Sequence, residues 1–256
     1  MTTLKKCFSF SFIFLVLLMS ISQARAKNDS ILVFATEPTF PPFEFVEKGQ
    51  FKGLDIDLAL ALCEELHKTC KFQKIPWDSL IPSLMQNKVD AIIGAIAVTE
   101  ERAKNINFTQ AYFNNSMIFT GVKGKHLRAC PMCLADKIIG VQGGTAFDTY
   151  LKEIYGNTLK IRRYPSQQHA FLDLKAGRLD AVLSDTPIAN YWLKQPGNEG
   201  YSAFGEEIRP KNTPLYYAIG VNKNNPILLD AINKALKTLE NNGKLASIKK
   251  QYLDKP

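Results

Sequence analysis

Residues 84–95 have the sequence LMQNKVDAIIGA, and residues 174–185 repeat its pattern as LKAGRLDAVLSD. In each copy an amphipathic helix ends, a turn follows, and the apolar spacing changes from helical to continuous at an Asp-Ala step. This change is typical of a helix that leads into a buried strand of a parallel sheet. The repetition therefore predicts two similar α/β lobes, each with a central sheet.

Charged side chains of opposite sign follow the two copies. Arg102 comes shortly after the first copy, behind Thr99, which we expect to cap a helix, and Asp185 ends the second copy. Ligands of open parallel sheets bind beyond the carboxyl ends of the strands, so the pair predicts a zwitterion held between the lobes. Two alternatives remain open: Arg102 paired with Glu101 at the surface, and Asp185 paired with a lysine or capping the next helix.

The first 26 residues have the features of a signal peptide. Lys5 and Lys6 precede an apolar run over residues 8–21, and the small residues Ala24 and Ala26 provide a cleavage site. An uncleaved membrane anchor is the alternative, although the run is short for a bilayer. We expect an exported, soluble mature chain.

The charge of the mature chain is positive but dispersed. Removing the three basic residues of the signal peptide leaves 29 Lys and Arg against 24 Asp and Glu, a net charge of +5. The densest basic clusters, at residues 123–128 and 249–250, contain no Phe, Tyr or Trp. Because a nucleic-acid surface needs clustered basic residues interleaved with aromatic ones, we expect no nucleic-acid partner.

Four cysteines follow the signal peptide, and their spacing favours two local disulfides in an oxidising compartment. The pairs would join Cys63 with Cys70 and Cys130 with Cys133. A redox pair or half of a zinc site are the alternatives for Cys130 and Cys133, but the sequence shows neither a strand leading into the motif nor a second ligand pair. We expect no metal and no cofactor.

The order of the expected elements predicts that the first lobe is discontinuous. We place lobe 1 at residues 27–119 and 217–256, and lobe 2 at residues 120–216. Extended apolar stretches at residues 117–122 and 216–221 would cross between the lobes as antiparallel hinge strands. Two such crossings permit closure of the lobes on a ligand.

Two motifs are compatible with ordinary helix capping. Asp55 and Asp57 have the spacing of a metal pair, but we expect Asp55 to cap the helix that it begins. Gly143, Gly144 and Thr145 follow an expected strand and open an expected helix, which is the geometry of an anion site made of backbone amides. A tight turn with a Thr cap is the alternative.

Glu37, Phe40 and Trp77 follow expected strands of lobe 1 and predict a site for a flat cation. A guanidinium group stacks on aromatic faces while its edge pairs with a carboxylate. Burial of both rings in the core is the alternative. The Pro-rich loop around Phe40 is a poor place for a core residue, which favours the cation site.

The chain closely resembles the periplasmic amino-acid-binding proteins of ABC importers, in the polar amino acid group. The likeness covers residues 27–256 and rests on seven motifs: FATE at 34–37, PPFE at 41–44, GLDIDL at 53–58, DSLIPSL at 78–84, TEER at 99–102, GVQGGT at 140–145 and DAVLSD at 180–185. It implies an α/β fold of two lobes with central mixed sheets joined by two hinge strands, periplasmic binding protein type II-like. It also implies a periplasmic protein, which we expect to be a monomer, that delivers its cargo to a membrane ABC permease. Cys63 and Cys70 match the spacing of a disulfide known in the members that bind basic amino acids.

The resemblance implies how an amino acid would bind. Arg102 would bind the α-carboxylate, aided by the amide and hydroxyl of Thr145. Asp185 would bind the α-ammonium near the Gly94 carbonyl. The complete predicted site comprises Glu37, Phe40, Trp77, Gly94, Ala95, Ala97, Arg102, Gly144, Thr145 and Asp185.

The resemblance also implies the side-chain specificity. Phe40 and Trp77 would flank the ligand side chain and Glu37 would meet its distal cation, so arginine is the predicted ligand. Two departures from the family affect selectivity more than the binding of the α-groups. Ala97 stands where relatives usually carry Ser or Thr, and Ala146 stands where they often carry Thr, Gln or Gly.

Two other functions remain open at this stage. One is a binder of another polar amino acid, such as glutamine or histidine. The other is an exported dehydratase-like enzyme on the same scaffold, which needs a general acid or base in the cleft. The three His lie outside the strand ends and Glu37 is the one candidate there, so we expect a binding protein with no catalytic residues.

Overall fold

The computed structural model describes residues 30–210 and 215–253. The described residues from 32 onward form one compact unit, which carries the candidate site. The predicted signal peptide lies outside the described residues. Within the described ranges, no helix has the length and apolar character needed to span a membrane.

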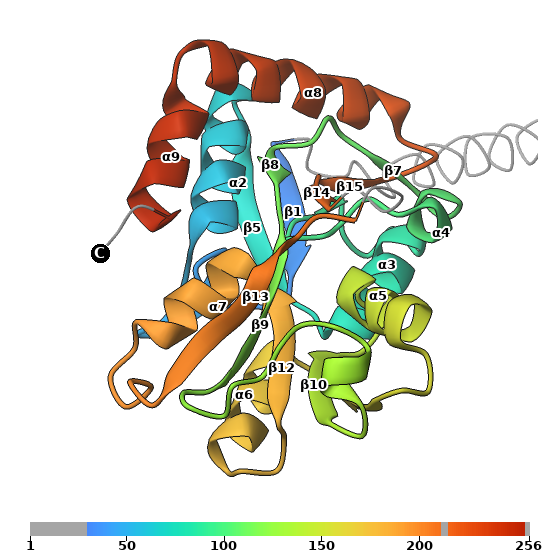
Figure 1. The fold of residues 1–256 in the computed structure, drawn as a ribbon. Helices are drawn as coiled ribbons and strands as arrows, with labels where there is room; N and C mark the ends of the chain where they lie inside the picture. The colour runs from blue at the N-terminus through green and yellow to red at the C-terminus, as the bar shows by residue number, and fades with distance from the viewer. Residues whose placement is uncertain (1–29, 211–214, 254–256) are drawn as a thin grey trace, which may run out of the picture. The chain divides into compact units, whose positions relative to one another are not determined.

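The first lobe is built on a mixed five-stranded sheet (Figure 1). In spatial order its strands are β5 (Thr69–Lys74), β1 (Ile31–Thr36), β6 (Ala91–Ile92), β15 (Gly220–Asn222) and β7 (Ile106–Phe108). Its helices are α2 (Leu54–Glu65), α3 (Leu80–Met85), the short α4 (Glu100–Ala103), α8 (Pro226–Asn241) and α9 (Lys244–Leu253). Strand β15 runs antiparallel to both of its neighbours, and α8 and α9 pack on α2, so the C-terminal segment lies with the N-terminal elements.

The second lobe repeats this arrangement. Its strands, in spatial order, are β11 (Lys160–Tyr164), β10 (Ile138–Gln142), β12 (Ala181–Asp185), β9 (Met117–Val122) and β13 (Tyr201–Ile208). Its helices are α5 (Ala146–Tyr155), α6 (Gln167–Lys175) and α7 (Thr186–Leu193). The predicted fold class, two α/β lobes with mixed sheets, is confirmed.

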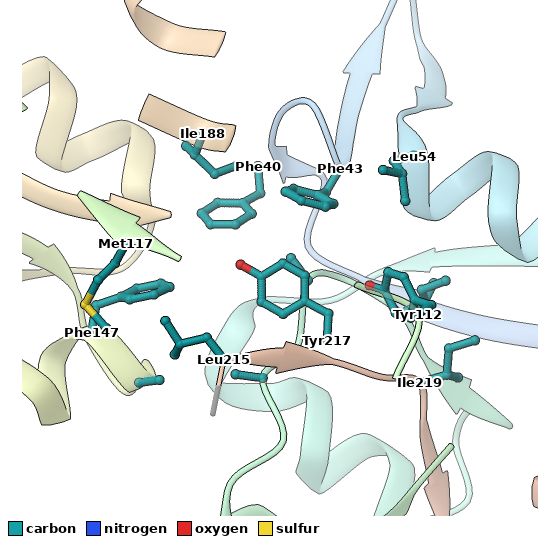
Figure 2. Packing of buried hydrophobic residues seen from close by; sticks show 14 of the residues in the cluster. Phe40, Phe43, Leu54, Tyr112, Met117, Phe147, Ile188, Leu215, Tyr217 and Ile219 are labelled. Carbon is teal, nitrogen blue, oxygen red and sulfur yellow. The ribbon is translucent and has the colours of Figure 1, made fainter. Parts of the chain in front are cut away.

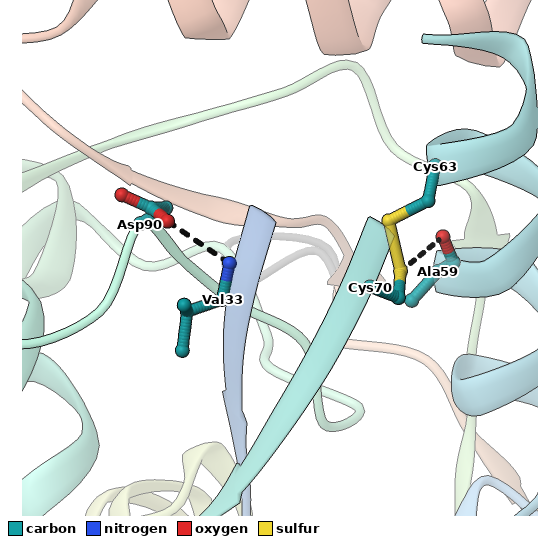
Figure 3. Close-up of a disulfide and its surroundings, with 5 residues drawn as sticks. All are labelled: Val33, Ala59, Cys63, Cys70 and Asp90. Atoms are coloured by element: carbon teal, nitrogen blue, oxygen red, sulfur yellow. Dashed lines mark hydrogen bonds between the residues drawn. A yellow bond between two sulfur atoms is a disulfide. The ribbon is translucent and has the colours of Figure 1, made fainter. Parts of the chain in front are cut away.

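The Asp of the Asp-Ala step has the same structural role in both sequence repeats. Asp90 accepts a hydrogen bond from the Val33 amide at 2.9 Å through its carboxylate (Figure 3). Asp180 accepts one from the Ile138 amide at the same distance. Each Asp also donates its own amide to the carbonyl of the same partner residue. The carboxylate therefore aligns the incoming strand, β6 or β12, with the parallel strand beside it, and this explains why both copies carry Asp at this position.

The crossings between the lobes differ from the prediction. Strand β9, residues 117–122, does not pair with residues 216–221; it lies between β12 and β13 inside the second sheet. The antiparallel crossing pair consists instead of β8 (Phe113–Asn114) and β14 (Tyr216–Tyr217). Residues 117–122 are apolar because β9 is a buried central strand, in which Met117 and Phe119 are fully buried.

The crossing strands pack against a small three-stranded sheet of lobe 1. This sheet contains β2 (Thr39–Phe40), β3 (Glu44–Glu47) and β4 (Gln50–Lys52). The Tyr217 ring meets the Phe43 ring edge-on at 5.3 Å and stacks on Phe113 at 5.6 Å. Figure 2 shows Tyr217 among apolar side chains of both lobes, including Met117 and Phe147. The crossing is therefore anchored in a continuous core.

Both expected cysteine pairs have sulfur atoms at bonding distance. Cys63, near the end of α2, joins Cys70 in β5, as Figure 3 shows, and Cys130 joins Cys133 in the loop before β10. Among the described residues, no group of three or more His, Cys, Asp or Glu side chains is arranged to hold a metal ion.

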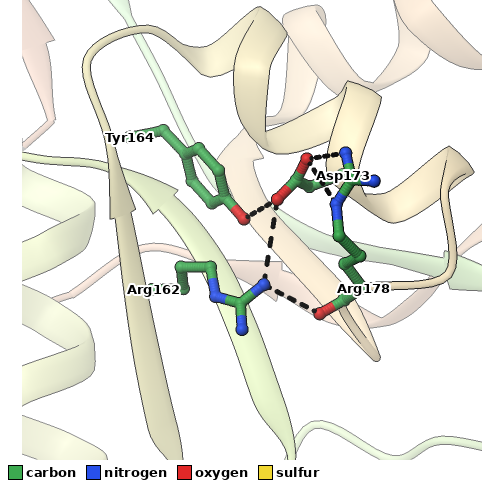
Figure 4. Close-up of polar contacts among 4 residues, drawn as sticks. All are labelled: Arg162, Tyr164, Asp173 and Arg178. Atoms are coloured by element: carbon green, nitrogen blue, oxygen red, sulfur yellow. Dashed lines mark hydrogen bonds and ion pairs between the residues drawn. The ribbon is translucent and has the colours of Figure 1, made fainter.

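A polar cluster ties the outer helix of lobe 2 to its edge strand (Figure 4). Asp173 in α6 accepts a hydrogen bond from the Tyr164 hydroxyl at 2.6 Å, and the Arg178 guanidinium forms an ion pair with it. Arg162 lies 3.8 Å from the same carboxylate. The hydrogen bond from Arg178 and then that from Tyr164 lower the pKa of Asp173 to about 2, so this carboxylate stays ionised under ordinary conditions.

Candidate functional site

A small cavity brings the two strand-end regions together. Nine of the ten residues of the predicted site line it, and Gly144 does not. Four further residues complete the wall, and of these the sequence had singled out Ala146 as a departure from the family. The lining consists of Glu37, Phe40, Glu44, Trp77, Gly94, Ala95, Ala97, Arg102, Gln142, Thr145, Ala146, Phe147 and Asp185.

Arg102 supplies the cation of the cavity. Thr99 caps α4 by accepting a hydrogen bond from the Arg102 amide at 3.2 Å, which confirms the predicted cap and sets the direction of the Arg102 side chain. The guanidinium donates to the Ala97 carbonyl at 2.8 Å and to the Gly144 carbonyl, on the other lobe, at 3.0 Å. It also lies 5.0 Å from the Trp77 ring centre.

The guanidinium keeps its charge and has donors to spare. Burial lowers the pKa of Arg102 to about 10, so the group remains protonated at neutral pH. A guanidinium carries five N–H donors, and the two carbonyl bonds use two of them. Both bonds hold the guanidinium in the wall of the cavity, which argues against the alternative that Arg102 pairs with Glu101 at the surface. Donors remain for an anionic group that enters the cavity.

Asp185 supplies the opposite charge. It ends β12, it is fully buried, and the Asn115 side-chain amide donates to its Oδ1. Its Oδ2 is buried without a hydrogen-bond partner in the described part of the chain. Burial raises the pKa of Asp185 well above its ordinary value. Because a buried carboxylate without a cation is costly, this position favours a partner that carries a positive charge.

The alternative role for Asp185, a helix cap, does not hold. Asp185 occupies the N-cap position of α7, but its side chain makes no capping bond. Its partner Asn115 lies next to the crossing strands and also donates to the Tyr217 hydroxyl at 2.7 Å. The carboxylate is therefore held by the segment that joins the lobes, a contact that no local sequence signal could reveal.

Glu37 and Gln142 close one end of the cavity from opposite lobes. The Gln142 side-chain amide donates to Glu37 Oε2 at 3.1 Å and to the Pro165 carbonyl at 3.3 Å. Burial raises the pKa of Glu37, although the bond from Gln142 partly offsets this. Gln142 ends the parallel strand β10, so the rule that selected Asp185 at the end of β12 could have selected it too.

The aromatic walls serve both the core and the cavity. Phe40 lines the cavity while its ring stacks near Phe43, with centroids 6.5 Å apart, and it is only 8% exposed. Trp77 is half-buried, and its indole N–H donates to the Gly144 carbonyl at 3.4 Å. The two alternatives for these rings are therefore compatible.

The Gly-Gly-Thr turn behaves mainly as a capped helix start. Thr145 caps α5 by accepting from the Asp148 amide at 3.3 Å, and its hydroxyl donates to the Gln142 carbonyl at 2.8 Å. The Gly144 carbonyl receives donors from Arg102 and Trp77, so Gly144 links the lobes and does not line the cavity. Its φ of +66° is one that glycine adopts without strain.

The prediction that Asp55 caps α2 is wrong. The N-cap is Gly53, which makes no side-chain bond, and Asp55 turns into the core, where it is fully buried. Its Oδ2 accepts from the Ala95 amide at 2.6 Å and from the Tyr112 hydroxyl at 2.8 Å. The carboxylate thus supports the Gly94–Ala95 wall of the cavity from behind, because tertiary partners outcompete the local amides.

Comparisons with known proteins agree with this geometry. Residues 32–255 match the family described as bacterial extracellular solute-binding proteins, family 3. An arginine-binding periplasmic protein of Mannheimia haemolytica is 35% identical over 226 residues, 86% of this chain and 90% of the relative. A histidine-binding periplasmic protein of Salmonella typhimurium is 32% identical over 223 residues, 86% of each chain. The solved structure of an ancestral arginine-binding protein bound to glutamine has a TM-score of 0.81 at 33% identity, covering 88% of this chain and 99% of its own.

Proposed function

Because the chain belongs to the bacterial extracellular solute-binding proteins of family 3, we propose that it binds a basic L-amino acid, arginine first, between its lobes and passes it to an ABC permease. It is a binding protein and not an enzyme, as the names of its relatives indicate. One observation carries the proposal: the Arg102 guanidinium lines the same cavity as the Asp185 carboxylate, whose Oδ2 has no partner among the described residues.

The proposed binding of the α-groups rests on charge and geometry. The ligand carboxylate accepts hydrogen bonds from the free donors of Arg102 and from the amides at the start of α5, behind the Thr145 cap. The ligand ammonium pairs with Asp185 Oδ2 and with the backbone of Gly94, Ala95 and Ala97. A dissociation constant in the micromolar range corresponds to a binding free energy of about −8 kcal/mol, which two ion pairs in a water-poor cavity are able to supply.

The proposed side-chain specificity rests on the other end of the cavity. Phe40 and Trp77 offer aromatic faces to a guanidinium, and Glu37 offers a carboxylate to its edge. Gln142 holds that carboxylate and provides a further polar group. Ala97 brings only its backbone, and its carbonyl already accepts from Arg102. These groups favour a long cationic side chain over a short neutral one.

Another polar amino acid is the second candidate ligand. The histidine-binding relative and the glutamine bound to the ancestral structure favour it, since both proteins are similar to this chain along most of its length. Glutamine would place its amide against Gln142 and Glu37, and histidine would place its ring between the aromatic walls.

The cellular setting is also a proposal. The relatives are periplasmic, and the N-terminal sequence favours export through a cleaved signal peptide, so we place the mature protein in the periplasm as a monomer. We propose that lobe 1 closes on lobe 2 by bending at the crossing strands β8 and β14.

The test is calorimetric titration of protein that has been unfolded and refolded to remove any ligand acquired during expression. Arginine, lysine, ornithine, histidine and glutamine are titrated separately, and arginine is expected to bind with the highest affinity. No heat with any of the five refutes the proposed function. Arg102→Lys, which keeps the charge but removes the planar fork, should weaken binding at least tenfold. Arg163→Lys, at an exposed position of β11, is the matched control and should have no effect.

A further inference from the structure

Glu44 is a buried carboxyl group in the cavity wall that the proposed function leaves without a role. It begins β3, is 2% exposed, and lines the cavity together with Glu37 and Asp185. Its Oε2 is buried without a hydrogen-bond partner among the described residues. A methyl group on Gly94 would lie 3.4 Å from Glu44 Oε1, so the carboxyl packs directly behind the glycine that forms the wall.

A second buried carboxyl group lies within hydrogen-bonding reach of Glu44. This group is Asp55, and its Oδ1 also has no partner in the described part of the chain. Its Oδ2 is occupied by the Ala95 amide and the Tyr112 hydroxyl. Two adjacent carboxyl groups in a dry environment do not ionise together, so the pair retains one proton.

The charged surroundings of the pair are acidic. The groups that act electrostatically on Glu44 are Asp55 from α2, Glu37 after β1 and Asp185 at the end of β12. Burial first, and then these neighbours, raises the pKa of Glu44 well above its ordinary value, and burial raises the pKa of Asp55 to about 7. Arg102 is the cation that lines the same cavity, and two of its donors are directed to the Ala97 and Gly144 carbonyls.

We propose that the Glu44–Asp55 pair holds one proton in the empty site and releases it when a ligand with a cationic side chain enters. This inference rests on the proposed function and adds one property to it. The same site distinguishes cationic from neutral ligands because only a cationic ligand side chain displaces the proton of the pair. The carboxyl O–H bond breaks, the proton passes to the solvent, and the ionised pair then faces the positive charge of the ligand. A neutral side chain supplies no such charge and leaves the proton in place.

The sign of the pH dependence follows from linkage. The empty site binds the proton more tightly than the cation-filled site, so raising the pH favours the complex. The association constant for arginine should rise with pH by up to about tenfold per unit, between the pKa of the pair in the complex and its pKa in the empty site.

Asp185 and Glu37 are the competing sources of a released proton. The α-ammonium, which meets Asp185 and the Gly94 backbone in front of Glu44, is present in every L-amino acid, so any proton that it displaces is common to all ligands. A comparison of arginine with citrulline, which has nearly the same shape and no side-chain charge, isolates the effect of the distal cation. Separate substitutions then distinguish Glu44 from Glu37.

The experiment is calorimetry near pH 7 in phosphate and in Tris, whose different ionisation heats give the number of protons released per ligand bound. The wild-type protein should release more protons with arginine than with citrulline, by a measurable fraction of one. Glu44→Gln should abolish the excess, while Glu37→Gln and the exposed control Glu47→Gln should retain it. Equal proton release with arginine and citrulline, or an excess that persists in Glu44→Gln, overturns the proposal.

A second measurement protects the test against a variant that does not fold or a ligand that does not bind. The arginine affinity of the wild-type protein is measured from pH 5.5 to pH 8.5, and a flat profile overturns the proposal. Asp55→Asn, checked by thermal unfolding, should reduce the rise as Glu44→Gln does, to the part that citrulline also shows. A rise specific to arginine that persists in both variants also overturns the proposal. If no amino acid binds at all, the proposed function fails and this inference fails with it. Binding without excess proton release refutes this inference alone.

Discussion

Replacing Asp185 by Asn should have opposite effects on ligand affinity and on the stability of the empty protein. The carboxylate is fully buried, it accepts from Asn115, and its Oδ2 has no partner in the described chain. Asn retains the shape and an acceptor for Asn115 but removes the charge. Breaking one partner of a buried charge pair costs about 2–5 kcal/mol, so arginine affinity should fall by about 30-fold to several thousand-fold.

The empty protein should become more stable for the same reason. A buried polar group without a partner costs about 1–3 kcal/mol, and more if it is charged. Removing the charge should raise the melting temperature of the ligand-free protein by roughly 2–12 °C, since 1 kcal/mol shifts a domain of this size by about 2–4 °C. Burial raises the pKa of the carboxyl group, so its cost grows as the pH rises past that pKa. The gain from Asn should therefore be larger at pH 8 than at pH 6.

The assays are calorimetric titration with arginine and thermal unfolding of the ligand-free protein at both pH values. Asp180→Asn is the matched control, because Asp180 lies on the same segment but bonds the Ile138 amide and does not line the cavity. It should leave affinity unchanged and should not raise the melting temperature. An Asp185→Asn protein that binds arginine like the wild type, or that melts at a lower temperature when empty, would refute the reasoning.

Three further predictions concern specificity, backbone geometry and acid stability. Glu37→Gln should reduce arginine affinity by about tenfold or more and glutamine affinity less, as measured by calorimetry, because only arginine brings a distal charge; equal losses would mean that Glu37 does not sense charge. Gly53→Ala should destabilise the protein by more than 3 kcal/mol in denaturant unfolding, since its φ is +126° and the new Cβ would lie 2.1 Å from the Phe43 carbonyl oxygen. The pKa of Asp173 is lowered to about 2, mainly by Arg178, and lies below its unfolded value of about 3.9. Its contribution to stability is therefore complete above about pH 5 and is lost as the pH falls through about 2, so Asp173→Asn should flatten that part of the stability profile in acid unfolding.

Part of the fold was predictable because its signals are local. The change from helical to continuous apolar spacing at Asp90 and Asp180 depends only on neighbouring residues, and it predicted two similar lobes correctly. The cap at Thr99 is local in the same sense, since its hydroxyl bonds an amide three residues away. Side chains at the carboxyl ends of parallel strands could also be located, because the position of a strand end follows from the pattern.

The errors arose where a partner lies far away in the sequence. Asp55 was expected to bond amides of its own helix, but the fold brings the Ala95 amide and the Tyr112 hydroxyl to it, 40 and 57 residues away. Residues 117–122 were expected to cross between the lobes, but two flanking strands of lobe 2 bury them. Glu44 was quoted only as part of a motif, because a charged residue between two Phe predicts an exposed edge strand and gives no sign of burial.

The sequence by itself determined the class of the protein: two α/β lobes, a cation after one repeat and an anion at the end of the other. These properties follow from periodicity and from residue type, which folding does not alter. Only the tertiary structure decided which charges remain without partners. One oxygen of Asp185 accepts a hydrogen bond from Asn115, and the other has no partner among the described residues. Asp90 and Asp180 instead accept hydrogen bonds from strand amides. The physical reason is that a free carboxylate and a satisfied one differ in their long-range neighbours, and those neighbours exist only after the two lobes have come together.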